Sequence, residues 1–126
     1  MPAPYPTWIE VNLTAIQHNL KQVQDWVKTP VMAVVKDNAY GHGALEVSRA
    51  VLAAGAAWLA VVRVGEGLEL RAAGIEAPIL VLGGAVPGEV DAALSAGLTL
   101  PVHSFDSAEL LSARAHALGL HAPVHL

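Results

Sequence analysis

The chain has 126 residues, which is enough for one domain with a hydrophobic core, and 54% of them are hydrophobic. It contains no cysteine, which excludes disulfides and thiolate metal sites, and its net charge of −4 argues against a nucleic-acid surface. Uncharged stretches such as residues 50–62 are shorter than the ~20 residues of a membrane span, and the N-terminus lacks the features of a signal peptide. We therefore expect a cytoplasmic protein that neither binds nucleic acid nor crosses a membrane.

Apolar runs alternate with helical patterns along the chain. The pattern opens with a short alternating strand over residues 7–11, followed by a helix over about 14–27, with Thr14 as its N-cap and Pro30 as its stop. Further strands are predicted at residues 31–35, 58–62, 79–82, 98–102 and 122–126. Further helices are predicted at residues 44–54, at 65–73, from Pro87 onward, and from the Ser104 cap to 118, where Gly119 ends the last one.

This alternation predicts parallel strands joined by right-handed crossovers, so the expected fold class is α/β. Periodicity alone leaves two architectures open, a (β/α)8 barrel and an open doubly wound sheet. A full (β/α)8 barrel takes roughly 250 residues. We therefore expect the 126 residues to supply about the first half of such a domain, either as a piece of a longer protein or as a half barrel completed by a partner.

Lys36 closes the apolar run of residues 31–35 and precedes a glycine-rich turn. A lysine there lies at the end of a buried strand, where barrels and open α/β sheets keep their active sites. Apolar surroundings remove water from an amine and favour its neutral form, which can form a Schiff base with a carbonyl compound such as pyridoxal phosphate. The structural alternative is a lysine that only extends from the strand end into solvent.

The stretch AVVKDNAYGHG at residues 33–43 resembles the pyridoxal-phosphate signature of alanine racemases, and only Asp37 departs from the usual alanine. Residues 8–13, 54–61 and 74–83 are also similar to that family, so the resemblance covers nearly the whole chain. It implies a (β/α)8 TIM-type barrel, of which residues 1–126 form the N-terminal part, with the rest of the barrel and a β domain lying outside them. It also implies an enzyme that interconverts L- and D-alanine and supplies D-alanine for peptidoglycan.

The resemblance assigns roles to four residues of this chain. Lys36 would hold pyridoxal 5'-phosphate covalently and act as one of two catalytic bases, and Tyr40 would donate its hydroxyl to the cofactor phosphate. Val34 and Leu82 would line the pocket beside the cofactor ring. A structural alternative for Tyr40 is a ring that packs over the barrel mouth. Asp37 is expected to point away from the cofactor, because neighbours on an extended chain face opposite sides.

The resemblance also implies what these residues lack. The second base would be a tyrosine from the β domain of a partner subunit, so the parent protein is expected to be a homodimer. We expect the 126 residues alone to show no measurable racemisation and at most to bind pyridoxal phosphate. Two alternatives are a half barrel that needs a second chain for activity, and another barrel-type pyridoxal enzyme such as a decarboxylase or a broad-specificity racemase, although the turn at residues 38–43 favours alanine racemase.

Histidines offer a weaker set of candidates. His42 is expected to make a hydrogen bond within its turn, since the sequence supplies it with no catalytic partner. His116, His121 and His125 crowd the end of the chain, but Pro123 separates the last two, and two histidines four apart bind zinc only on one helical face. No metal site is therefore expected.

Overall fold

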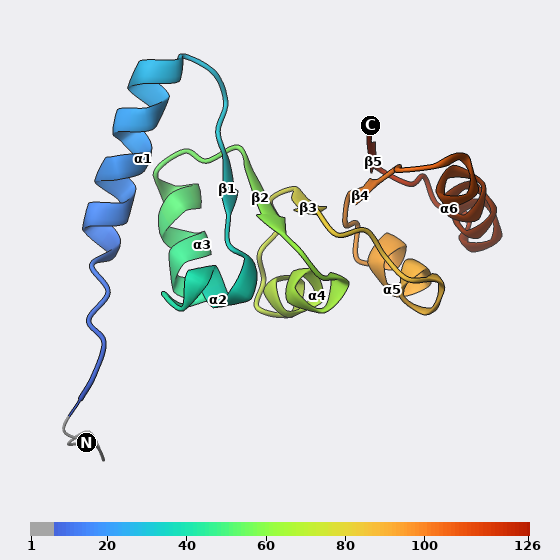
Figure 1. Ribbon diagram of the computed structural model, residues 1–126, viewed down its shortest axis with the longest axis horizontal. Coiled ribbons are helices and arrows are strands. Elements are labelled where there is room, and N and C mark those ends of the chain that lie inside the picture. Colours follow the sequence, from blue (N-terminus) through green and yellow to red (C-terminus); the bar gives the residue numbers. More distant parts are fainter. Residues whose placement is uncertain (1–6) are drawn as a thin grey trace.

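The computed structural model describes residues 7–126, which form alternating strands and helices (Figure 1). The strands are β1 (Met32–Val34), β2 (Trp58–Val61), β3 (Ile79–Val81), β4 (Leu100–Pro101) and β5 (Val124–His125). The helices are α1 (Leu13–Val27), α2 (Lys36–Tyr40), α3 (Ala44–Ala53), α4 (Val64–Ala72), α5 (Val90–Ser95) and α6 (Phe105–Leu118), with a 3-10 turn η1 (Pro87–Glu89) before α5. Apart from α2, which lies where the sequence predicts a turn, the predicted order of elements from the first helix onward is confirmed.

All strand pairs are parallel and follow one another in chain order. Strands β1, β2 and β3 form one sheet, and β4 pairs with β5. The bridge between Leu80 and Thr99 joins the two sheets, with the Thr99 amide donating to Ile79 at 2.9 Å and the Val81 amide donating to Thr99 at 3.0 Å. The α/β prediction is therefore confirmed.

Helices cover one face of this sheet, as in a barrel, whereas a doubly wound sheet has both faces covered. Figure 1 shows α3, α4 and α5 lined up on the same side of the strands. Side chains on that face of the strands, including Leu59, Val61, Ile79 and Val81, are fully buried in one hydrophobic core with the helices. Val34 and Leu82 lie outside this core and are exposed, whereas Ala60 and Leu80, on the same face as Val34, are buried, so the opposite face of the sheet is open only at the carboxyl ends of β1 and β3.

Three predictions for the start of the chain are wrong. Residues 7–11 form no strand, because all but Val11 are exposed and no strand among residues 7–126 pairs with them. The first helix is capped by Asn12, whose side chain accepts the Ala15 amide at 2.9 Å, and not by Thr14. It ends at Val27, and its left-handed C-cap Lys28 donates its amide to the Gln24 carbonyl, so Pro30 is not the residue that ends it.

Arg71 holds together the amino ends of β3 and β4. Its guanidinium donates to the carbonyls of Ile75 at 2.7 Å and Ala77 at 2.8 Å, just before β3. It also donates to Ala96 at 2.9 Å and to Gly97 at 3.3 Å, just before β4. The planar guanidinium of arginine therefore donates to carbonyls of two loops at once, which the single ammonium of lysine cannot do.

We expect Arg71→Lys to lower the free energy of unfolding by about 2 kcal/mol, since two or more charged hydrogen bonds are lost. Urea denaturation measures this value. Arg49→Lys is the matched control, because Arg49 is exposed and makes a single 3.2 Å bond to Ala73. Equal losses for the two variants would contradict the role given to Arg71.

Candidate functional site

Lys36 lies at the carboxyl end of β1, as the sequence predicts. The β1–β2 ladder ends one residue earlier, where the Val35 amide donates to the Ala60 carbonyl at 2.8 Å. Val35 itself is buried in the core, so Lys36 emerges directly from a fixed position, with 34% of its side chain exposed. The Lys36 side chain is therefore reachable from solvent but partly covered by the protein.

The turn after Lys36 is left-handed. Asp37, Asn38, Ala39 and Tyr40 all have φ between 50° and 54°. Left-handed backbone costs L-residues roughly 1–2 kcal/mol each, so four in a row store strain, which is typical of functional sites. The expectation of an extended chain at residues 36–37 is wrong, because the chain coils back on itself here.

Hydrogen bonds hold this strained turn. The Ala39 amide donates to the Val35 carbonyl at 3.0 Å, and the Gly43 amide donates to Asn38 at 2.9 Å. The Asn38 side chain accepts the Ala44 amide at 2.8 Å and so links the turn to the start of α3. Gly43 has a φ of +94°, which favours glycine at the end of the turn.

Because of the left-handed turn, Asp37 lies on the same side as the Lys36 amine. Its carboxylate is 3.7 Å from Lys36 Nζ, which corrects the expectation that it points away. The Asp37 side chain is 60% exposed, and ion pairs at such exposed sites are weak.

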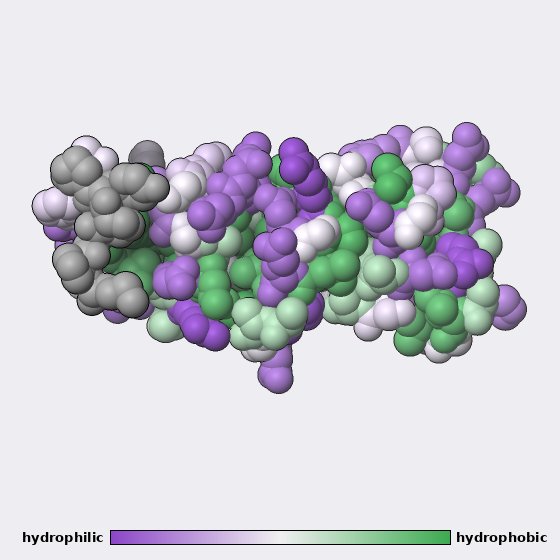
Figure 2. Space-filling model, turned by 90° about the horizontal axis from the view of Figure 1, so that it is seen from below, coloured by the Kyte–Doolittle hydropathy of each residue, from purple (hydrophilic) through white to green (hydrophobic). Residues whose placement is uncertain are grey.

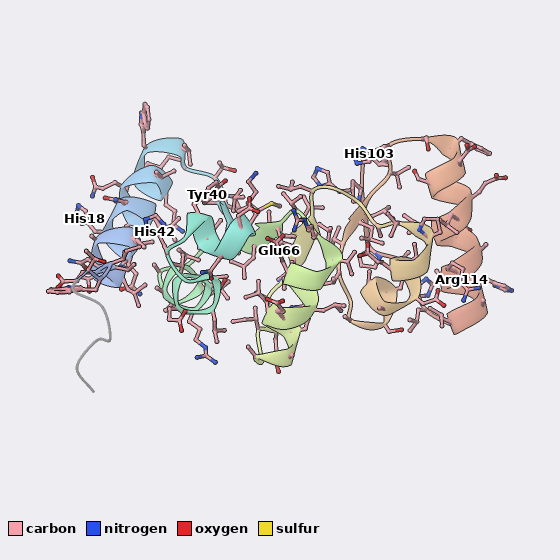
Figure 3. The ribbon with its side chains drawn as sticks, turned by 60° about the horizontal axis from the view of Figure 1, so that its bottom comes forward. His18, Tyr40, His42, Glu66, His103 and Arg114 are labelled. Atoms are coloured by element: carbon pink, nitrogen blue, oxygen red, sulfur yellow. The ribbon has the colours of Figure 1, made fainter. Side chains whose placement is uncertain are left out.

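Tyr40 lies beside the same amine. Lys36 Nζ is 5.7 Å from the centre of the Tyr40 ring, within range of a cation–π contact. The residue is 61% exposed, so the turn presents it at the surface rather than packing it into the core. Figure 3 shows Tyr40 and His42 on the segment that follows β1.

Val34 and Leu82 lie on the open face of the sheet, at the ends of β1 and β3. They are 40% and 42% exposed. Beyond Leu82, a hollow of about 370 Å³ opens at the ends of β2 and β3, with Arg63, Gly83 and Gly84 in its lining. Apolar surface is open in several places on the molecule (Figure 2), so these two residues alone do not mark a pocket.

Glu66 is a residue to which the sequence assigned no role. It lies on α4, beside the turn, where Figure 3 labels it. One carboxylate oxygen accepts the Asp37 amide at 2.6 Å, and the other accepts the amides of Val62 and Arg63, both at 2.9 Å. The available signal was the capping pattern, in which an acidic residue stands three positions after the N-cap Arg63.

These contacts set the acidity of Glu66. Burial raises its pKa, but hydrogen bonds from the amides of Arg63, Asp37 and Val62, together with the Arg63 charge, hold the pKa below the ordinary value of 4.5. The folded protein therefore favours the carboxylate. Its contribution to stability is complete above the pKa of the unfolded chain and is lost as the pH falls through the lower folded pKa.

We expect the stability difference between the wild type and Glu66→Gln to be largest near neutral pH and to shrink below about pH 4.5. Urea denaturation at a series of pH values measures this difference. Glu69→Gln is the control, since Glu69 is exposed on the same helix. A difference that grows toward acid pH would contradict the assignment.

The histidines show no catalytic arrangement. His42 Nδ1 lies 2.9 Å from the Ala39 carbonyl, so this nitrogen must carry the hydrogen, and the predicted turn hydrogen bond is confirmed. Within residues 7–126, no group of three histidine or carboxylate side chains is placed to hold a metal ion. In the same part of the chain, no helix is both long and apolar enough to cross a membrane.

Comparison with known proteins gives this site its context. Residues 11–126 match the family described as "Alanine racemase, N-terminal domain". The chain belongs to this family. It is 48% identical to an alanine racemase of Desulforamulus reducens and 46% identical to one of Symbiobacterium thermophilum, each over 96% of this chain. It spans about a third of the length of these relatives (33% and 32%).

Solved structures agree with the sequence relatives. An alanine racemase of Clostridium difficile 630 superposes with a TM-score of 0.93 at 35% identity, over 98% of this chain and 33% of that one. A histidine racemase from Leuconostoc mesenteroides superposes with a TM-score of 0.82 at 31% identity, over 89% of this chain and 30% of that one. The fold is therefore the first part of the alanine racemase barrel, as predicted.

Proposed function

We propose that residues 1–126 are the N-terminal part of the pyridoxal-phosphate-binding barrel of an alanine racemase, and that Lys36 is the residue that binds the cofactor. The observation that carries this proposal is the left-handed turn, which presents the Lys36 amine at the end of β1 with the Tyr40 ring 5.7 Å away. The family membership and the 43–48% identity to alanine racemases support the substrate.

The residues present suit pyridoxal phosphate in their chemistry. Lys36 offers an amine to the aldehyde, and Tyr40 offers an exposed neutral donor to the phosphate without adding a competing charge. Val34 and Leu82 offer apolar side chains on the open face to an aromatic ring. When bound, the cofactor supplies an electron sink that makes the hydrogen on the α-carbon of an amino acid acidic.

Lys36 has two tasks in this proposal. Lys36 would hold the cofactor through its Nζ, and its amine would move the α-proton of an amino acid on its own face. A racemase needs a second base on the other face. We propose that this base lies outside residues 1–126, as a tyrosine of the partner subunit in a homodimer.

Borohydride trapping tests the cofactor assignment. After incubation of the purified protein with pyridoxal phosphate and reduction, peptide mass mapping is expected to find the label on Lys36 in preference to Lys21 and Lys28 of the first helix and its cap. Tyr40→Phe is expected to reduce labelling by pyridoxal phosphate about tenfold while leaving labelling by pyridoxal, which lacks the phosphate, unchanged. Equal labelling of all three lysines would contradict the proposal.

The histidine racemase among the structural matches raises a second candidate for the substrate, because it shares this fold at 31% identity. The higher identity to alanine racemases favours alanine. Racemisation assays on the dimeric enzyme with alanine and histidine separate the two. We expect turnover of alanine in the dimer and none in residues 1–126 alone; turnover by the short chain would mean that it holds both bases.

A further inference from the structure

The end of the β1–β2 ladder has an unusual hydrogen-bond partner. After the bond from the Val35 amide to Ala60, a parallel ladder would continue with a bond from the Val62 amide to the Val35 carbonyl. The next bond would run from the Asp37 amide to the Val62 carbonyl. Both of these carbonyls accept a different amide. Val35 accepts the Ala39 amide at 3.0 Å, and Val62 accepts the Gly83 amide at 3.1 Å.

Both freed amides donate to Glu66 instead. The Asp37 amide lies 2.6 Å from Oε1 and the Val62 amide 2.9 Å from Oε2. One side chain of α4 therefore takes the place of two hydrogen bonds of the sheet. Because it does so, β1 can turn away into the left-handed segment while its end stays bonded to β2.

We propose that Glu66 is a positioning residue for Lys36, a role that rests on the proposed function of Lys36. Lys36 lies between two anchored peptide groups, since the Val35 amide is fixed by Ala60 and the Asp37 amide by Glu66. Without the second anchor, the strain of four left-handed residues favours relaxation of the turn, and the amine moves with it. Small displacements of a reacting group have large effects on its reactivity.

The test compares Lys36 labelling in four proteins that all contain the full chain. Pyridoxal phosphate and borohydride label Lys36, and the exposed Lys21 and Lys28 serve as internal references. Glu66→Gln is expected to lower the ratio of Lys36 to reference labelling by about tenfold or more. Glu69→Gln, an exposed position on the same helix, is expected to leave the ratio unchanged.

Arg71→Lys controls for stability alone. This residue holds the amino ends of β3 and β4, away from the turn after Lys36. Its loss therefore weakens the fold without changing any contact of that turn. A ratio that falls equally in Arg71→Lys and Glu66→Gln would overturn the proposal. An unchanged ratio in folded Glu66→Gln would also overturn it.

A second variant and a hydrogen-exchange measurement test the role of Glu66 independently. Where Glu66→Gln does not fold, Glu66→Asp replaces it. Its shorter side chain is expected to keep the bonds to the Val62 and Arg63 amides but not to reach the Asp37 amide at the end of β1. The same fall in the ratio of Lys36 to reference labelling is expected. Amide hydrogen exchange at Asp37 is expected to be slow in the wild type and at least about tenfold faster in either variant. Unchanged exchange contradicts the proposal.

Failure of the proposed function would look different. If wild-type Lys36 does not take up pyridoxal phosphate, the cofactor assignment is wrong. Reductive methylation with formaldehyde then reports the reactivity of Lys36 directly. An altered Lys36 ratio in Glu66→Gln supports the role of Glu66 in that case, and an unaltered ratio refutes it.

Discussion

In the proposed function, Lys36→Ala is expected to abolish covalent binding of pyridoxal phosphate and to lower racemisation by the proposed dimeric racemase by at least about 10³-fold. The physical reason is that the amine is both the point of covalent attachment and a proton carrier in the proposed function. Absorbance of the bound cofactor and a coupled D-alanine assay measure the two losses. Labelling at other lysines should continue at its wild-type rate.

Two further variants sharpen this prediction. Lys36→Arg keeps the positive charge but presents a guanidinium that stays protonated, so we expect the same loss as for alanine. Lys21→Ala removes an exposed lysine of α1 and is expected to have no effect. Retained cofactor binding in Lys36→Arg would show that charge, rather than covalent attachment, holds the cofactor at this site.

Local patterns in the sequence predicted most of the fold. The apolar runs and the glycines after them place β2, β3 and α6 within one or two residues of the observed bounds, because both signals depend only on nearby residues. The strand at residues 7–11 failed for the opposite reason. Alternation describes a strand, but a strand forms only beside a partner, and residues 7–11 have none among residues 7–126.

The site was harder to predict than the fold. Lys36 and Tyr40 were proposed from their motif, but the left-handed turn that follows Lys36 was not predicted, since only Asp37 and Asn38 among its four residues are of types that favour this conformation. The turn is held in part by Glu66, which lies 29 residues from Asp37 and links the ends of β1 and β2. Such a contact leaves no periodic signal, and the same is true of the ion pair between Asp37 and Lys36.

Gly83 lies at the point where the end of β3 passes close to β2. A methyl group added at this position would lie 2.6 Å from the Val62 carbonyl oxygen and 3.3 Å from the Val62 side chain. The backbone cannot move aside freely, because the amides of Leu82 and Gly83 donate to Val61 at 2.7 Å and to Val62 at 3.1 Å. The contact is therefore one that only glycine allows.

We expect Gly83→Ala to lower the free energy of unfolding by about 2–4 kcal/mol, because the clash is with backbone and its relief breaks hydrogen bonds of the sheet. Gly65→Ala is the matched control. Gly65 lies in α4 with open space around its added methyl, so alanine there should raise stability by up to about 1 kcal/mol. Since Leu82 precedes Gly83 directly, the same displacement should also weaken pyridoxal phosphate labelling of Lys36, whereas Gly65→Ala should not. Urea denaturation and the trapping assay measure both effects, and a Gly83→Ala protein as stable as the wild type would mean that β3 can separate from β2 without cost.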